Sequence, residues 1–122
     1  MPLGLEDGRI SNPLMRASSY QSSTYSPWRA RLNLNYGWIA ARNNRNQWLQ
    51  LDSLAKTKFT KVATQGRKNG RGNWVKSYAV RYSHKGYSWQ TYKENGRKKV
   101  KSSRFTHFSC LFTVIQKVFL YL

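Results

Sequence analysis

Acidic residues are scarce in this sequence, and their scarcity limits the chemistry that the protein can perform. The chain of 122 residues has 4 Asp and Glu against 22 Lys and Arg, a formal net charge of +18 at pH 7. The four acids are Glu6, Asp7, Asp52 and Glu94. Glu6 and Asp7 are adjacent, so on a strand their side chains would face opposite sides. The sequence therefore gives little support to a catalytic mechanism that uses two paired carboxylates. The excess positive charge favours nucleic acid, anionic lipid or sulfated glycan as a partner.

Cysteine and histidine are also rare. Cys110 is the single cysteine, so no intrachain disulfide can form. His84 and His107 have no cysteine or acid at metal-ligand spacing, so we expect no metal site and no cofactor. The serines between Ser18 and Ser23 lack histidine and acid partners that the sequence can place nearby, and we expect no enzymatic activity.

No segment is apolar enough to predict export or membrane insertion. The N-terminal stretch "MPLGLEDGRI" lacks the basic and apolar regions of a secretory signal peptide. Residues 108–122 are mostly apolar, but Gln116 and Lys117 interrupt them and the stretch is shorter than the about 20 residues that a spanning helix needs. We therefore predict neither a signal peptide nor a transmembrane segment.

Short alternating segments separated by turn residues predict an all-β domain. The segment "QWLQLD" at 47–52 alternates, "FTKVAT" at 59–64 reads as a second strand, and 74–83 is the longest candidate. "SHKG" at 83–86 is typical of a hairpin turn in which glycine supplies a positive φ, and "YSWQTY" at 87–92 would be the partner strand. No long amphipathic helix is predicted.

The predicted strand at 74–83 has one apolar face. Trp74, Tyr78, Val80 and Tyr82 share that face, whereas the opposite face, which includes Ala79, is expected to be half exposed. Residues 17–27 and 41–47 read as loops because they are rich in Ser, Tyr, Asn and Arg without apolar periodicity.

Eight segments, in this order, resemble the coagulation factor V/VIII type C domain, also called the discoidin domain. They are "PLGLEDGRI" from Pro2, "ASSY" from Ala17, "WRARLN" from Trp28, "GW" from Gly37, "QWLQLD" from Gln47, "ATQGR" from Ala63, "VKSYAVRYS" from Val75 and "GYSWQTY" from Gly86. The resemblance covers residues 2–100 as a partial domain, and 101–122 read as a basic and apolar tail outside the family.

The resemblance implies a discoidin-type jelly-roll β-sandwich. Family members have eight strands and a cysteine near the start that pairs with one at the end, and this chain lacks both cysteines. We therefore expect an incomplete sandwich, truncated at its C-terminal end, in which the closing strands are missing or replaced.

The resemblance also implies a non-catalytic recognition or adhesion module that is extracellular or at the cell surface, although the chain shows no signal peptide. Such domains bind phosphatidylserine membranes, galactose- or fucose-type glycans, collagen or a peptide C-terminus through loops at one end. We expect a glycan or a collagen-like matrix protein as the partner, with an anionic membrane surface as a further option. The oligomeric state is left open.

Residues 21–27, 33–46 and 67–73 correspond to the binding loops. Aromatic rings stack on sugar faces and arginine binds carboxylate or sulfate with two parallel hydrogen bonds. The third loop, "RKNGRGN", has no apolar residue, which disfavours deep membrane insertion. The candidate ligand-binding residues are Tyr25, Trp28, Tyr36, Asn43, Arg67, Lys68, Arg71 and Trp74.

Some of these candidates have a second interpretation. For Trp28 and Trp74, packing within the sandwich is favoured over ligand contact. In the peptide-binding neuropilin type, the positions that resemble Tyr25 and Asn43 line the pocket, and the second is an acid there. Asn43 departs from that pattern.

Two other functions stay open on the sequence. Lysine and arginine interleaved with Trp and Tyr are what a single-strand nucleic-acid binder needs, although the ordered family segments rank this below ligand recognition. The chain is alternatively a fragment of a larger multidomain adhesion protein with no function of its own.

Overall fold

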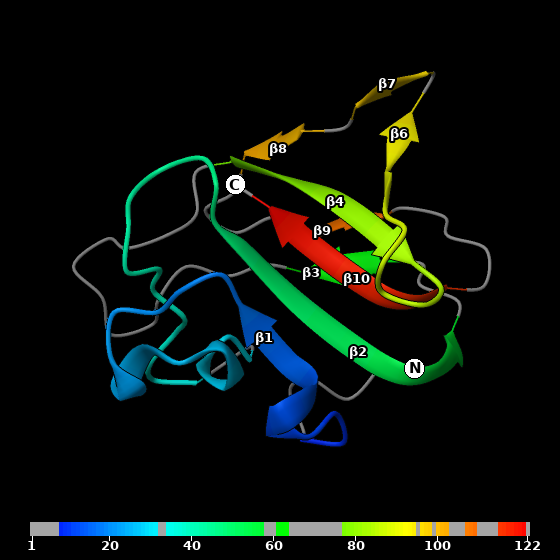
Figure 1. The fold of residues 1–122 in the computed structure, drawn as a ribbon. Coiled ribbons are helices and arrows are strands. Elements are labelled where there is room, and N and C mark those ends of the chain that lie inside the picture. Colours follow the sequence, from blue (N-terminus) through cyan, green and yellow to red (C-terminus); the bar gives the residue numbers. More distant parts are fainter. Residues whose placement is uncertain are drawn as a thin grey trace.

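The sheets of the computed structural model consist of antiparallel strands, joined by loops and short 3-10 turns (Figure 1). It describes residues 8–31, 34–57, 61–63, 77–94, 96–98, 100–102, 107–109 and 115–121. The helices of this part are three-residue 3-10 turns that precede β2: η1 (Asn12–Leu14), η2 (Ser23–Tyr25) and η3 (Pro27–Arg29). No helix in the described ranges is long and apolar enough to cross a membrane.

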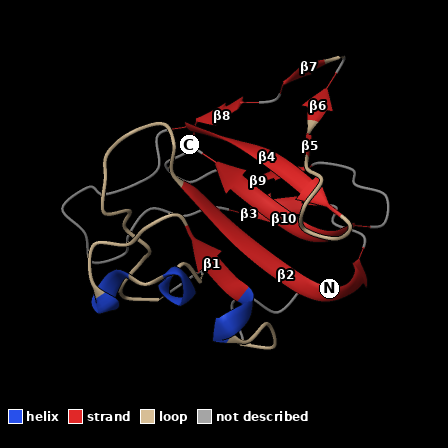
Figure 2. Cartoon of the chain, viewed as in Figure 1, coloured by secondary structure: helices blue, strands red, loops and turns tan. Residues whose placement is uncertain are grey.

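The strands form one large and two small antiparallel sheets (Figure 2). The six-stranded sheet has the order β1-β2-β10-β4-β5, and β8 also pairs with β4. β3 pairs with β9, and β6 pairs with β7. The strands are β1 (Met15–Ala17), β2 (Trp48–Thr57), β3 (Lys61–Ala63), β4 (Ser77–Ser83), β5 (Gln90–Thr91), β6 (Lys93–Glu94), β7 (Arg97–Lys98), β8 (Val100–Ser102), β9 (His107–Ser109) and β10 (Ile115–Tyr121).

β10 lies between β2 and β4 and defines two ends of the large sheet. Tyr121 at its end is opposite Trp48 of β2 and Ala79 of β4, whereas Lys117 is opposite Asp52 and Ser83. β2 and β4 therefore both begin at the Tyr121 end. The connection from β1 to β2 lies at this end, and the connection from β4 to β5 lies at the other.

The expected tail contributes strands to the fold. β9 and β10 both come from residues 101–122, and β10 is the strand that joins β2 to β4. A boundary between a family domain at 2–100 and a separate tail stays a prediction, and Cys110 lies outside the described residues.

β2 is longer than the predicted 47–52 segment because an irregularity lets it continue past Asp52. The register with β10 shifts between Ile115 and Lys117. Leu54 has a φ of 61°, and its backbone N–H donates to Asp52 Oδ1 at 2.8 Å. A bulge of this kind bends a strand without ending its pairing.

The centre of β4 supplies much of the buried core. Tyr78 and Val80 are buried as the alternation predicts, but Ala79 on the opposite face is also buried, with 3% of its surface exposed. The expectation of a half-exposed second face is therefore wrong at Ala79. β4 is an interior strand that pairs with β10 on one side and with β5 and β8 on the other, and at this point both of its faces are covered.

The predicted hairpin after β4 is present with a longer connection. Ser83 Oγ accepts hydrogen bonds from the backbone N–H groups of Lys85 at 3.3 Å and Gly86 at 2.8 Å. Gly86 has a φ of 91°, the positive value expected for this glycine. The returning strand pairs only at Gln90 and Thr91, because residues 84–89 form the connection.

Candidate functional site

The connection from β1 to β2 forms what we call the loop end, residues 18–47 without the two that the structure leaves undescribed. Gln47 anchors it, with only 5% of its surface exposed. Its Oε1 accepts hydrogen bonds from the hydroxyls of Ser18 at 2.8 Å and Ser19 at 2.6 Å. Its Nε2 donates to Asn44 Oδ1 at 2.8 Å. One side chain thus ties both ends of the connection together.

Backbone hydrogen bonds then hold two segments of the loop end side by side. The Gln21 N–H donates to the Ile39 carbonyl at 2.9 Å, and the Ile39 N–H donates to the Tyr25 carbonyl at 3.3 Å. The Trp38 indole N–H donates to the Ser19 carbonyl at 2.8 Å. The loop end is therefore a fixed platform, which lowers the entropy that a ligand would have to remove.

Tyr25, Arg29 and Tyr36 meet on this platform, and we call them the Tyr–Arg cluster. The rings of Tyr25 and Tyr36 have centroids 6.3 Å apart and meet edge to face at 69°. The guanidinium carbon of Arg29 is 6.0 Å from the Tyr36 ring centroid. Tyr36 is 44% exposed, so the cluster presents an aromatic surface and a cation to solvent.

A second aromatic pair lies in the same connection. The rings of Tyr20 and Trp28 have centroids 6.4 Å apart and are tilted by 57°. Trp28 is half-buried, whereas Tyr20 is 46% exposed. This burial is compatible with both interpretations of Trp28, packing and ligand contact.

The structure brings some predicted site residues together and leaves others apart. Tyr25 and Tyr36 are in contact, and Trp28 belongs to the separate pair with Tyr20. Asn43 is exposed, and no described side chain is recorded as bonded to it. Four candidates lie outside the described residues: Arg67, Lys68, Arg71 and Trp74.

Sequence reasoning missed Arg29, Tyr20 and Gln47. Arg29 is one of 22 basic residues, and composition does not tell which of them lies over a ring. Tyr20 stands in the "ASSY" segment next to a predicted binding loop, and that position could have marked it. Gln47 gives no signal, because its serine partners are almost thirty positions away.

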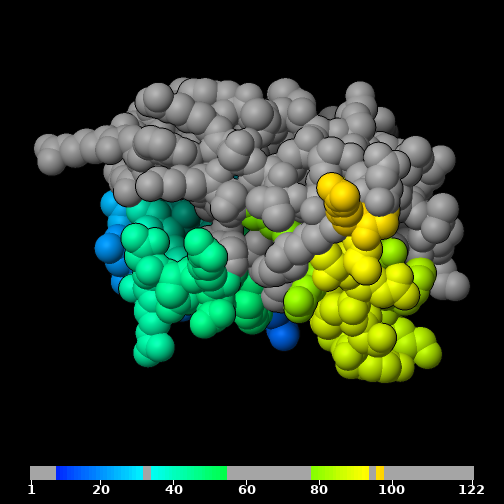
Figure 3. Space-filling model, turned by 90° about the horizontal axis from the view of Figure 1, so that it is seen from above, coloured from blue at the N-terminus to red at the C-terminus, as the bar shows by residue number. Residues whose placement is uncertain are grey.

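The Tyr–Arg cluster offers a ligand aromatic surface and a cation. Within the described ranges, no three His, Cys, Asp or Glu side chains lie close enough to hold a metal ion. Figure 3 shows the loop-end residues in cyan and teal on one part of the surface, apart from the yellow hairpin residues. The fold and this platform together indicate a class of protein. It is the jelly-roll β-sandwich with an ordered loop surface at one end.

Comparison with known proteins gives the family. The model of the F5/8 type C domain matches residues 15–113, and the chain belongs to this family. Coagulation factor V of Sus scrofa is 43% identical over 101 residues, which cover 76% of this chain and 4% of that protein. The chain thus spans a small fraction of the length of this relative.

Two solved structures illustrate the shared fold. Discoidin II of Dictyostelium discoideum superposes with a TM-score of 0.70 at 21% identity, covering 88% of this chain and 48% of that one. A chitosan-binding module from a chitosanase/glucanase of Paenibacillus sp. IK-5, in complex with chitotriose, gives 0.65 at 15% identity and covers 88% and 80%. At these identities the likeness concerns the fold.

Proposed function

We propose that this chain is a non-catalytic, extracellular recognition module that binds a glycan through its loop end. The observation that carries the proposal is the Tyr–Arg cluster, which presents a half-exposed ring beside a guanidinium on a platform fixed by Gln47. A sugar has apolar C–H faces that pack on an aromatic ring and hydroxyl or acid groups that accept hydrogen bonds from arginine. A structural neighbour that binds chitotriose supports this chemistry on the same fold.

The module belongs outside the cell under this proposal. A chain related to a coagulation factor and carrying an exposed aromatic platform fits recognition of a surface or matrix glycan. Arg67, Lys68 and Arg71 of the third predicted loop would add cations, and Trp74 a ring. The chain enters β4 at Ser77, at the same end of the sheet as the loop end.

The test is a glycan array probed with the full chain, followed by titration of the best neutral glycan against Tyr36→Ala. We expect about a tenfold loss of affinity, because truncating a central aromatic residue commonly costs more than 1 kcal/mol of binding energy. Leu54→Ala is the control, since Leu54 is 65% exposed and lies on β2 away from the cluster. Unchanged affinity in folded Tyr36→Ala, or no bound glycan on the array, would contradict the proposal.

An anionic membrane surface is the second candidate, and the net charge of +18 favours it. Each cation close to such a surface contributes about 1 kcal/mol. The described rings at the loop end are tyrosines and tryptophans, which suit the interface more than the bilayer interior. Sedimentation with phosphatidylserine vesicles, with phosphatidylcholine vesicles as the control, separates this candidate from glycan binding. Titration of a collagen peptide, in place of the glycan, tests a matrix protein as the partner.

A further inference from the structure

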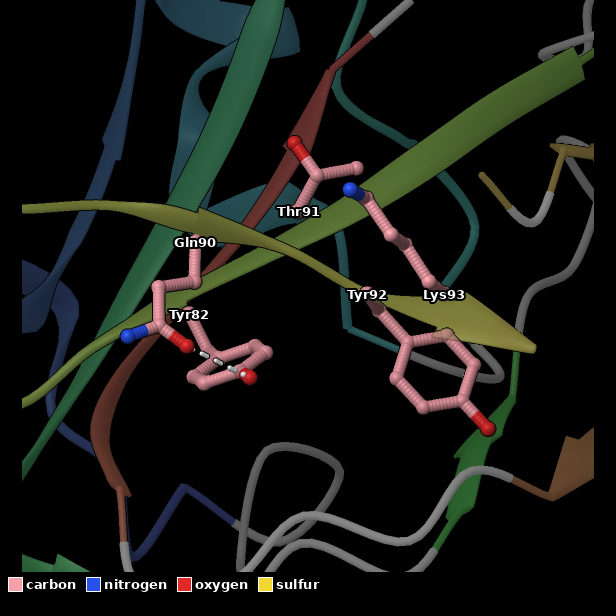
Figure 4. A pocket seen from close by; sticks show the side chains of 5 residues that line it. All are labelled: Tyr82, Gln90, Thr91, Tyr92 and Lys93. Carbon is pink, nitrogen blue, oxygen red and sulfur yellow. Dashed lines mark hydrogen bonds between the residues drawn. The ribbon is translucent and has the colours of Figure 1, made fainter. Parts of the chain in front are cut away.

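A hollow lies beside the β4–β5 hairpin, on strands that the loop end does not use. It measures about 520 Å³ and is lined by Tyr82, Gln90, Thr91, Tyr92 and Lys93 (Figure 4). Ligand sites commonly fall between about 300 and 1,000 Å³, so this hollow has the size of a binding site. A smaller one, about 240 Å³, shares Tyr82 and Gln90 with it and extends to His84, Lys85, Tyr87 and Ser88. We call the two together the hairpin groove.

Tyrosine rings and one amide form a row in this groove. Figure 4 shows Tyr82, Gln90 and Tyr92 on the same side of β5 and its continuation, with Gln90 joined to the Tyr82 hydroxyl. That hydroxyl donates to Gln90 Oε1 at 2.9 Å. The bond occupies the amide oxygen and leaves both amide N–H groups for an acceptor, and no acceptor is recorded for them among the described residues.

Cations flank the row. Lys85 and Lys93 are both exposed, and the single acid between residues 77 and 98 is Glu94. Figure 4 shows Lys93 and Thr91 on the side of the strand away from the tyrosines, so Lys93 borders the groove while Lys85 lines its smaller part. Tyr87 is 78% exposed beside Lys85. An acidic group that enters the smaller part from solvent would meet Lys85, and Lys93 adds positive charge from the other side of the strand.

The lining disfavours purely apolar partners. Its described residues are Tyr, Gln, Thr, Ser, Lys and His, with no aliphatic side chain among them. A lipid tail or the apolar face of a helix would leave the hydroxyl, amide and ammonium groups without hydrogen-bond partners. Rings that stack, paired amide donors and flanking cations together match a sugar chain that carries carboxylate or sulfate groups.

We propose that the hairpin groove is a second binding site, for an acidic saccharide. Lys117 pairs with Ser83 at the β4–β5 end of the sheet, whereas Tyr121 pairs with Trp48 at the loop end, so the two sites lie at opposite ends. The groove does not depend on what the loop end binds. With both sites filled, one chain joins two saccharides.

The test titrates a heparin hexasaccharide into the full chain at about 0.15 M salt, where surface charge is partly screened. The variant is Tyr87→Ala with Gln90→Ala, which leaves the net charge unchanged. We expect about a tenfold loss of affinity, as for the loss of a central contact. Arg16→Ala is the control: it removes one exposed cation on β1, outside the groove, and should change affinity less than about twofold.

Three results would overturn the second site. The first is wild-type affinity in the double variant with an unchanged circular dichroism spectrum, because attraction by net charge would then explain the binding. The second is displacement of heparin by an equal concentration of oligothymidine, which would assign the groove to single-stranded nucleic acid. The third is loss of heparin binding in Tyr36→Ala but not in the double variant, which would place the heparin at the loop end and leave the proposed glycan function standing.

Discussion

The two ends of the sheet present aromatic residues in different ways. At the loop end, the rings stand on a long connection that Gln47 and backbone hydrogen bonds hold in place. At the hairpin end, Tyr82 stands on a core strand, and only the short connection at 84–89 depends on turn geometry. We expect that replacing the buried Gln47 side chain loosens the loop end, whereas Tyr82 and Gln90 keep their places on the paired strands β4 and β5.

The largest effect is expected from replacing Gln47, which anchors the loop end. Gln47→Ala removes the three hydrogen bonds that this buried side chain makes with the Ser18 and Ser19 hydroxyls and with Asn44 Oδ1. We expect the free energy of unfolding to fall by about 2 kcal/mol, measured by urea denaturation. Glycan binding at the loop end should weaken more than this loss of stability explains, while heparin binding at the groove persists.

Gln21→Ala is the matched control, because Gln21 is exposed and its recorded bond uses the backbone N–H. It should leave both stability and binding unchanged. Equal weakening at both ends in Gln47→Ala would show that Gln47 stabilises the whole sandwich and not the loop end in particular.

Part of this organisation could be read from the sequence. Alternation predicts β2 and β4 and the buried positions Tyr78 and Val80, since a strand with one buried face must alternate. It could not predict that Ala79 is buried, because whether a second face is covered depends on neighbours far along the chain. The turn residues predict the positive φ at Gly86, because that signal is local.

The candidate site was less predictable than the strands. Tyr25 and Tyr36 were named as separate loop residues, and their edge-to-face contact depends on how two segments of the connection pair through Ile39. The role of Gln47 could not be found, because a polar residue before a strand reads as part of a turn. Local patterns thus locate the loops, and long-range hydrogen bonds decide which of their side chains meet.

A smaller effect is expected from the hairpin turn. Gly86 has a φ of 91°, where a side chain is strained, so Gly86→Ala should lower the free energy of unfolding by about 1 kcal/mol. Gly37→Ala is the control, because a Cβ there meets nothing within 4 Å and its φ is not positive. Thermal unfolding of both variants measures the difference. If Gly86→Ala melts at the same temperature as Gly37→Ala, the turn does not constrain the groove.

The smallest effect is expected from removing one hydroxyl in the groove. Tyr82→Phe keeps the ring and removes the hydroxyl that bonds Gln90 Oε1 at 2.9 Å. Because this bond is exposed, stability should fall by less than about 1 kcal/mol. The heparin affinity should fall by about two- to threefold, since the amide loses the partner that orients its N–H groups.

Tyr20→Phe is the matched control at the loop end, where the described residues show no hydrogen bond of the hydroxyl. A loss of heparin affinity as large in Tyr20→Phe as in Tyr82→Phe would mean that the Gln90 amide is not oriented for a ligand, and that the two ends do not act separately.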